Sequence, residues 1–252
     1  MLPISVIIIT KNEAVNIKDC ITAARLITDD IVVVDSGSED GTIEIIQSEN
    51  VKLIQLPWKG FGFARNTAAE ASKNDWILAI DADERVTPKL VHSISNILPP
   101  SPSDLYGFKR QNYFMGKRIR FGKWGKDTTY RLYNKQIISW DLTPVHESLV
   151  GNNIERKLLK GAFIKHYPVR KLTENTNKTY KYAKLNADKY FSQGKKATII
   201  KRFLSPVFDF LQSYIFFLGF LDGKMGFIVS YSNAKYTWLK YKYLHEMNKQ
   251  MN

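Results

Sequence analysis

The sequence predicts an α/β fold that consists of a parallel sheet with helices on its faces, followed by a helical C-terminal extension. The first hundred residues alternate short apolar, β-rich runs with segments of helical spacing. Beyond about residue 170, only helical patterns remain. We therefore expect an α/β domain over residues 1–170 and a helical extension over residues 171–252.

The expected strands of the α/β domain come in order along the chain. The four β-rich runs are residues 5–10, 31–35, 52–56 and 76–81. Since a helical segment follows each run, the strands should lie parallel and be joined by crossover helices. Less regular strand-like pieces at 106–114 and 128–134 are expected to complete the same domain.

The C-terminal extension should hold three helices. The first is expected from Leu172 to about Gly194 with Thr173 as N-cap, because glycine favours the position after a helix. The second should begin at Ser205-Pro206 and end near Gly219, and the third should cover about 226–248. The apolar stretch 207–221 is interrupted by polar residues and is shorter than the roughly 20 residues of a spanning helix, so no membrane span is expected.

Charge is distributed unevenly between the two halves of the chain. Residues 1–100 carry 9 Lys+Arg against 14 Asp+Glu, a net of −5, and residues 101–252 carry 28 against 10, a net of +18. The later half should therefore meet an anionic partner such as a membrane surface, a phosphorylated substrate or nucleic acid. A single cysteine, Cys20, excludes a disulfide framework and indicates a reducing compartment. The N-terminus has no basic segment typical of a signal peptide, so we expect a cytoplasmic protein.

Polar residues follow the ends of the predicted strands. These are Thr10, Asn12 and Glu13 after the first strand, Asp35 at the end of the second, and Asp81 and Asp83 at the end of the fourth. Ligands of open α/β sheets bind beyond the carboxyl ends of the strands. Two acids spaced Asp-x-Asp can bind sugar hydroxyls and a hard divalent cation, although an isolated pair is more often a surface turn.

Competing motifs are missing their required residues. The chain has no G-x-x-x-x-G-K-[ST] phosphate loop, and "KGFGFA" at 59–64 lacks the third glycine of a dinucleotide fingerprint. His146-Glu147 does not begin a zinc-protease motif, because position 150 is Val. The chain has one cysteine and four scattered histidines, and their spacing does not match a four-ligand structural zinc site.

The segments "TKNE", "VVDSGSEDGT", "ARN" and "DAD", in this order and spacing, resemble the family 2 glycosyltransferases. The resemblance implies the GT-A fold, a Rossmann-like domain of nucleotide-diphospho-sugar transferases. It also implies that Asp35 contacts uracil, Arg65 helps to hold the nucleotide and Asp81 contacts the ribose. Thr10, Asn12 and Glu13 belong to the same donor site by this resemblance, and Asp83 binds a divalent metal, Mg²⁺ or Mn²⁺.

The segment "TPVHESLV" at 143–150 supplies the candidate base. An inverting transfer needs a group that takes the proton from the attacking hydroxyl. Family members commonly place an acid at this distance after Asp-x-Asp, often in an "ED" pair, whereas this chain has His-Glu. We assign the base to Glu147, with His146 orienting it; the alternative is a glutamate in a solvated loop. His166 is a candidate metal ligand, although a lone histidine after a strand more commonly has a structural role.

The "V-H-E" form and the segment 203–227 resemble a subgroup of β-glucosyltransferases that act on the lipopolysaccharide inner core. This implies an inverting, metal-dependent transfer of a hexose, glucose from UDP-glucose, to a lipid-linked saccharide at the cytoplasmic face of a bacterial inner membrane. A capsule, O-antigen or polyprenyl-linked precursor is the alternative acceptor. A nucleic-acid-binding module is the alternative class, and we disfavour it because the acidic strand ends would repel a phosphodiester backbone.

Overall fold

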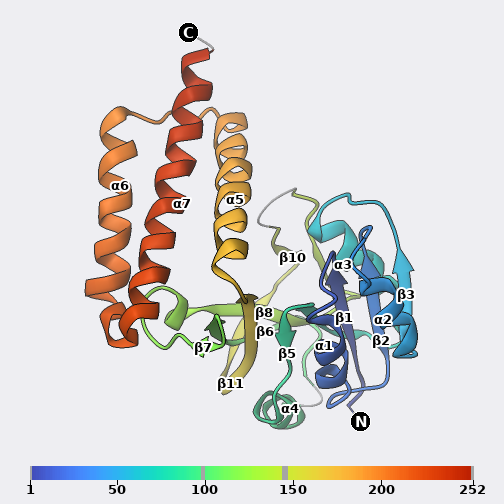
Figure 1. Ribbon diagram of the computed structural model, residues 1–252. Coiled ribbons are helices and arrows are strands. Elements are labelled where there is room, and N and C mark those ends of the chain that lie inside the picture. Colours follow the sequence, from blue (N-terminus) through green and yellow to red (C-terminus); the bar gives the residue numbers. More distant parts are fainter. Residues whose placement is uncertain (1, 98–99, 144–146, 251–252) are drawn as a thin grey trace. The chain divides into compact units, whose positions relative to one another are not determined.

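The computed structural model describes residues 2–97, 100–143 and 147–250. The chain forms two compact units (Figure 1). The first unit consists of Met1–Arg110 with Thr128–His166, and the second consists of Gln111–Asp127 with Tyr167–Asn252. Residues 111–127 therefore belong to the same unit as the C-terminal helices.

The first unit is built on a parallel sheet in the order β3-β2-β1-β4. The strands are β1 (Ile4–Thr10), β2 (Ile31–Asp35), β3 (Lys52–Gln55) and β4 (Trp76–Asp81). Their bounds lie within one residue of the expected runs, so the prediction of a parallel sheet is confirmed. In the register, Thr10 lies beside Asp35, and Ile9 lies beside Asp81.

Antiparallel strands extend this sheet beyond β4, in the order β4-β8-β6-β11-β5. They are β5 (Glu84–Arg85), β6 (Asp104–Phe114), β8 (Thr128–Asn134) and β11 (Glu155–Val169). Two short strands, β9 (Ile138–Trp140) and β10 (Leu149–Gly151), pair separately. The 15-residue strand β11 was not expected from the sequence, which placed His166 after a strand; His166 lies inside it.

Helices cover both faces of the parallel sheet. They are α1 (Ile17–Ala24), α2 (Thr42–Ser48), α3 (Phe61–Glu70) and α4 (Pro88–Ser95). Val6 and Ile8 pack in one core cluster with α1, whereas the intervening Ile7 packs in another with α3. This division follows from the alternation of side chains along a strand that is buried on both faces.

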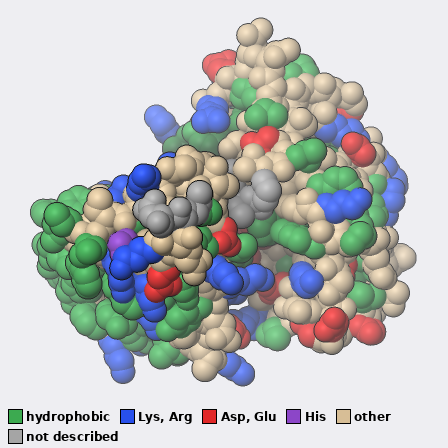
Figure 2. All heavy atoms as spheres, turned by 90° about the horizontal axis from the view of Figure 1, so that it is seen from above, with side chains coloured by type: hydrophobic (Ala, Val, Ile, Leu, Met, Phe, Trp, Pro, Cys, Tyr) green, Lys and Arg blue, Asp and Glu red, His purple; other side chains and the backbone are tan. Residues whose placement is uncertain are grey.

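The second unit contains three long helices, and α5 and α6 each pack along α7. Its elements are β7 (Lys117–Arg118), η1 (Trp124–Lys126), α5 (Leu172–Ser192), α6 (Ile199–Leu211), η2 (Gln212–Phe216), η3 (Gly219–Asp222) and α7 (Gly223–Gln250). Hydrophobic side chains gather over α6, at the left of Figure 2.

The expected starts of two helices were wrong. The N-cap of α5 is Lys171, not Thr173, although Gly194 follows the helix with φ of 69° as predicted. The helix α6 begins at Ile199, because the hydroxyl of Thr198 caps it by accepting from the Lys201 N–H at 3.1 Å. Pro206 lies inside this helix, not at its first position.

Candidate functional site

The candidate site lies at the carboxyl ends of β1, β2 and β4 in the first unit. The sheet register places Thr10 beside Asp35, and Asp81 follows on the other side of β1. The polar residues at the ends of these three strands therefore lie at one edge of the sheet. This is the edge at which open α/β sheets bind ligands.

The loop that follows β1 is fastened to the loop that follows β2. Asn12, in the left-handed conformation with φ of 55°, donates its backbone N–H to the hydroxyl of Ser38 at 2.8 Å, and its side-chain oxygen accepts from the Glu39 N–H at 2.8 Å. The N–H of Glu13 donates to Thr42 Oγ1 at 2.9 Å. These contacts fix the backbone at the edge of the site.

Asp35 is fully buried and organises its own turn. Its carboxylate accepts from the N–H groups of Gly37 and Ser38, each at 2.9 Å, and from the Ser38 hydroxyl. A carboxylate offers about four acceptor positions, so it can still take a donor such as a ring N–H. The hydroxyl of the neighbouring Thr10 is buried without a hydrogen-bond partner in the described structure, which is costly unless a ligand meets it.

Arg65 connects two of the predicted site carboxylates. Its guanidinium donates from Nη2 to Asp81 at 2.7 Å and from Nη1 to Glu147. Arg131 on β8 donates to the other oxygen of Asp81 at 3.2 Å. Both guanidinium carbons lie over the ring of Trp140, at 4.5 Å for Arg65 and 5.2 Å for Arg131. Asp81 is therefore held between two arginines.

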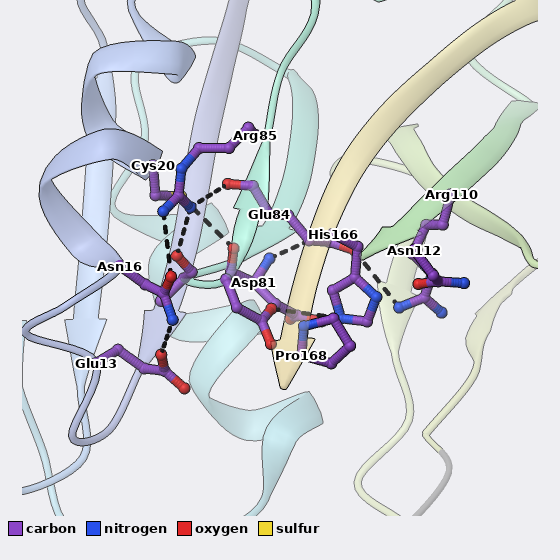
Figure 3. Close-up of polar contacts among 12 residues, drawn as sticks. Glu13, Asn16, Cys20, Asp81, Glu84, Arg85, Arg110, Asn112, His166 and Pro168 are labelled. Carbon is purple, nitrogen blue, oxygen red and sulfur yellow. Dashed lines mark hydrogen bonds and ion pairs between the residues drawn. The ribbon is translucent and has the colours of Figure 1, made fainter. Parts of the chain in front are cut away.

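This arrangement fixes the charge of Asp81. Burial alone would raise its pKa, but Arg131 and Arg65 lower it more, so the pKa of the carboxyl lies well below its usual range. The neighbouring Glu84 is fully buried and accepts from the backbone N–H of Asp81 at 2.9 Å (Figure 3). Burial, and then the negative charge of Asp81, raise the pKa of Glu84.

His166 lies beside Asp83 because β11 pairs with β5. The antiparallel register sets His166 opposite Glu84, and its Nε2 lies 3.5 Å from Asp83 Oδ1. Burial would lower the pKa of His166, but the Asp83 carboxylate outweighs it and the pKa is raised. The structure thus brings together the two residues that the sequence nominated as metal ligands.

These two side chains suit a divalent cation. One is a carboxylate and the other an imidazole, and both are partly exposed at 15%. Within the described ranges, no group of three or more His, Cys, Asp or Glu side chains could hold a metal ion. A cation here would therefore complete its shell with water and substrate oxygens, as Mg²⁺ does in phosphate sites.

Three residues of the site were not expected from the sequence: Glu84, Arg131 and Trp140. Glu84 follows Asp83 directly, and its position after the Asp-x-Asp pair is a signal that could have nominated it. Arg131 and Trp140 lie on β8 and β9, where nothing local distinguishes them from other strand residues. His146, the expected partner of Glu147, lies outside the described residues.

The side chain of Cys20 contacts the backbone of the site. It is fully buried, and its Sγ lies 3.5 Å from the Asp81 carbonyl oxygen. Burial raises the pKa of the thiol. Cys20 lies on the buried face of α1.

A sheet in this order, with an Asp-x-Asp turn at the end of β4 and an arginine from α3 bound to its first acid, defines a transferase domain of the GT-A type. The chain belongs to glycosyl transferase family 2, whose sequence pattern matches residues 5–160. The resemblance found in the sequence is therefore confirmed, and the protein is a glycosyltransferase.

Relatives extend over nearly the whole chain. An uncharacterized glycosyltransferase from Rickettsia bellii is 32% identical, over 99% of this chain and 88% of that protein. The lipopolysaccharide core biosynthesis glycosyltransferase LpsC from Rhizobium meliloti is 29% identical, over 94% of this chain and 90% of its own length. These matches extend beyond the α/β domain into the C-terminal helical region of the chain.

Two solved structures show a weaker likeness. Glucosyl-3-phosphoglycerate synthase from Mycobacterium tuberculosis, in complex with Mn²⁺, UDP and glucosyl-3-phosphoglycerate, is 24% identical over 44% of each chain, with a TM-score of 0.37. The mannosyltransferase PcManGT from Pyrobaculum calidifontis, in complex with GDP-Man and Mn²⁺, is 22% identical over 44% of this chain and 36% of that one, with a TM-score of 0.38.

Proposed function

We propose that this glycosyltransferase is metal-dependent and inverting, and that it moves a hexose, glucose from UDP-glucose, to a lipid-linked saccharide such as the lipopolysaccharide inner core. The observation that carries this proposal is the assembly of Asp81, Asp83, Glu147 and His166 around one strand end. Arg65 and the pairing of β5 with β11 bring these residues together from distant parts of the sequence.

The donor would lie along the edge formed by Thr10, Asp35 and Asp81. Asp35 has acceptor capacity for the uracil N–H, and the unpartnered hydroxyl of Thr10 would gain a partner. Arg65 and Arg131 already hold Asp81 ionised, which suits it to accept from the hydroxyls of a ribose. Support for this pose comes from the chemistry of the side chains at the edge.

Asp83 and His166 would hold the divalent cation, Mg²⁺ or Mn²⁺. When bound, the cation supplies positive charge against the phosphate oxygens of the leaving nucleoside diphosphate. The Asp83 carboxylate would supply an oxygen ligand, and His166 Nε2 lies 3.5 Å from its Oδ1. The backbone of this turn is held by Glu84, which accepts from the Asp81 N–H.

Glu147 would take the proton of the acceptor hydroxyl as that oxygen attacks the anomeric carbon. Its Oε1 accepts from Arg65, which leaves Oε2 to receive the proton. Attack from the side opposite the leaving diphosphate forms the new carbon–oxygen bond as the old one breaks, and it inverts the anomeric centre. The ion pair with Arg65 orients Glu147 in the site.

The lipid-linked acceptor is supported by the relationship to LpsC over 94% of the chain. Another cell-surface glycan precursor would use the same chemistry with a different acceptor pocket. The inner face of a bacterial inner membrane, where nucleotide sugars are available, is the proposed location of the reaction.

A screen of sugar nucleotides tests the proposed function. Because a ligand that binds only the folded state raises apparent stability, UDP-glucose should raise the melting temperature with Mn²⁺ and less without it. GDP-mannose and UDP-N-acetylglucosamine are the comparison donors. NMR of the product should then show a β-linked sugar from the α-linked donor. An unchanged melting temperature with every donor would contradict the proposal.

A further inference from the structure

The helix α6 exposes its apolar side chains to solvent. None of its residues is buried, and Ile200 and Leu204 are 69% and 63% exposed. The exposed series continues through η2 and η3, where Phe216 is 68% exposed. We call this set the apolar face; it consists of Ile199, Ile200, Phe203, Leu204, Val207, Phe208, Leu211, Ile215, Phe216, Leu218, Phe220 and Leu221.

Two polar side chains of the same segment, Asp209 and Ser213, point inward. Asp209 accepts from the hydroxyl of Thr237 on α7 at 2.8 Å and pairs with Lys123. Ser213 is fully buried and accepts from the Ser230 hydroxyl at 3.0 Å. A surface helix in water has the opposite arrangement, with its apolar stripe inside. The segment is therefore inverted with respect to an aqueous environment.

A large exposed apolar surface marks a site of interaction. Charge identifies the partner here. The second unit carries 20 Lys+Arg against 6 Asp+Glu, a net of +14, which is more than the +13 of the whole chain. An apolar surface within so basic a unit fits an anionic bilayer better than a basic second copy of itself.

Exposed cations flank the apolar face at both ends. Lys195 and Lys196 precede α6, and Lys201 lies in its first turn. At the other end, the segment 117–126 is fastened to η3, because Asp222 accepts from the N–H groups of Arg120 at 3.0 Å and Phe121 at 2.8 Å. The exposed cations near this end are Arg120, Lys126, whose Nζ lies over the Phe217 ring, and Lys224.

The charges of α6 and of the neighbouring α7 indicate how α6 would lie. In the described part of the chain, no single helix is long and apolar enough to cross a membrane, although Ile199–Phe216 and Gly219–Gln250, bent by 71°, pass that test as a pair. Upright insertion of α6 would bury Lys240 of the neighbouring α7 in hydrocarbon, because Lys240 lines the same pocket as Leu204 and Phe208. A helix parallel to the surface keeps both basic ends at the headgroups, with the lysine stems along apolar surface.

We propose that the apolar face of α6, η2 and η3 lies in the headgroup–acyl boundary of an anionic bilayer, parallel to its surface. Docking would keep the enzyme near an acceptor that cannot leave the membrane. The proposed docking depends only on residues of the second unit, whereas the proposed donor chemistry depends on residues of the first. Either proposal can therefore fail while the other holds.

Flotation of the full chain with vesicles tests the proposal. The vesicles are phosphatidylcholine alone, or phosphatidylcholine mixed with phosphatidylglycerol. The protein should float with the mixed vesicles, weakly with the neutral ones, and less at high salt. Ile200→Gln/Leu204→Gln/Val207→Gln should lower partitioning by about 100-fold or more. Lys195→Ala/Lys196→Ala should lower it roughly 30-fold, since each basic residue contributes about a factor of five.

Controls separate docking from folding and from donor binding. Leu26→Gln/Ile137→Gln changes exposed apolar residues of the first unit and should leave flotation unchanged. The α6 variant should keep the wild-type melting temperature and its stabilisation by UDP-glucose, because its substituted side chains are exposed. Equal flotation with both vesicle types, or none, would overturn the proposal. If the protein formed a dimer and did not bind vesicles, and the α6 variant abolished that dimer, the proposal would also be overturned. Resistance to extraction by carbonate would overturn the parallel placement.

Discussion

Arg65 donates to Asp81 and Glu147 with separate nitrogens of one guanidinium. The carboxylate expected to contact the donor and the one expected to act as base are thus joined through a single buried side chain, which is 3% exposed. A planar fork can satisfy two carboxylates at once, whereas an ammonium presents a point charge. We therefore expect Arg65 to couple donor binding to the position of the proposed base.

Replacing Arg65 by Lys should destabilise the first unit and weaken donor binding together. Breaking a buried ion pair costs about 3–5 kcal/mol, and Lys would retain only part of the interaction. Urea denaturation gives the stability, and titration with UDP gives the affinity. Arg25→Lys is the matched control, because Arg25 pairs with Glu49 at 2.7 Å but is 38% exposed, and it should cost about 1 kcal/mol or less. Equal effects of the two substitutions would contradict the role of Arg65.

Asp83→Asn should remove most of the activity and leave the fold intact. The substitution takes away the charge that attracts the cation, so turnover should fall by at least about 100-fold. Titration with Mn²⁺ should show weaker binding, which separates this effect from a loss of acceptor binding. Asp29→Asn, at an exposed position of the same unit, is the control. Undiminished metal-dependent turnover in Asp83→Asn would remove Asp83 from the metal site.

Glu147→Gln should lower turnover while affinity for UDP-glucose stays close to wild type. The amide oxygen can still accept from Arg65, but the side chain can no longer take a proton, and a general base contributes about 10²–10⁴ in rate. Single-turnover kinetics and a binding titration measure the two quantities. Glu155→Gln is the control, since that side chain is 66% exposed. Loss of affinity with turnover retained would make Glu147 a binding residue.

Thr10→Val should weaken donor binding without destabilising the free protein. The Thr10 hydroxyl is buried and unpartnered, so its removal should leave stability unchanged or raise it by about 1 kcal/mol. Thr42→Val makes the matched comparison, because Thr42 Oγ1 accepts from the Glu13 N–H and bonds to Asp40; it should cost about 1–2 kcal/mol. If Thr10→Val lowered the melting temperature as Thr42→Val does, the hydroxyl would have a structural partner.

The parallel half of the sheet and its polar strand ends could be predicted from the sequence because both are local patterns. An apolar run followed by Asp81 and Asp83 is visible within a few residues, and the parallel order places such ends together. The partners of these acids could not be predicted in the same way. Arg131 and His166 reach them through antiparallel pairings of β8 and β11, which depend on tertiary contacts.

The number of helices in the second unit could be predicted from the sequence. The start of α6 and the membership of the segment 111–127 in this unit could not. Ser205-Pro206 has the pattern of a helix start, yet the cap at Thr198 allows the helix to begin earlier and to continue through Pro206. The segment 111–127 joins the helices through distant contacts, such as the Met115 N–H bond to the Val169 carbonyl at 2.9 Å. Spacing along the chain carries no information about such contacts.

The reactivity of Cys20 can be used to measure local opening of the first unit. It is the single cysteine of the sequence, it is fully buried, and burial raises its pKa, so an alkylating reagent should modify it only when the first unit opens. Because its sulfur lies 3.5 Å from the Asp81 carbonyl, the opening that exposes it disturbs the end of β4. The rate of thiol labelling therefore measures, without any introduced probe, the free energy of the local opening that disturbs the end of β4.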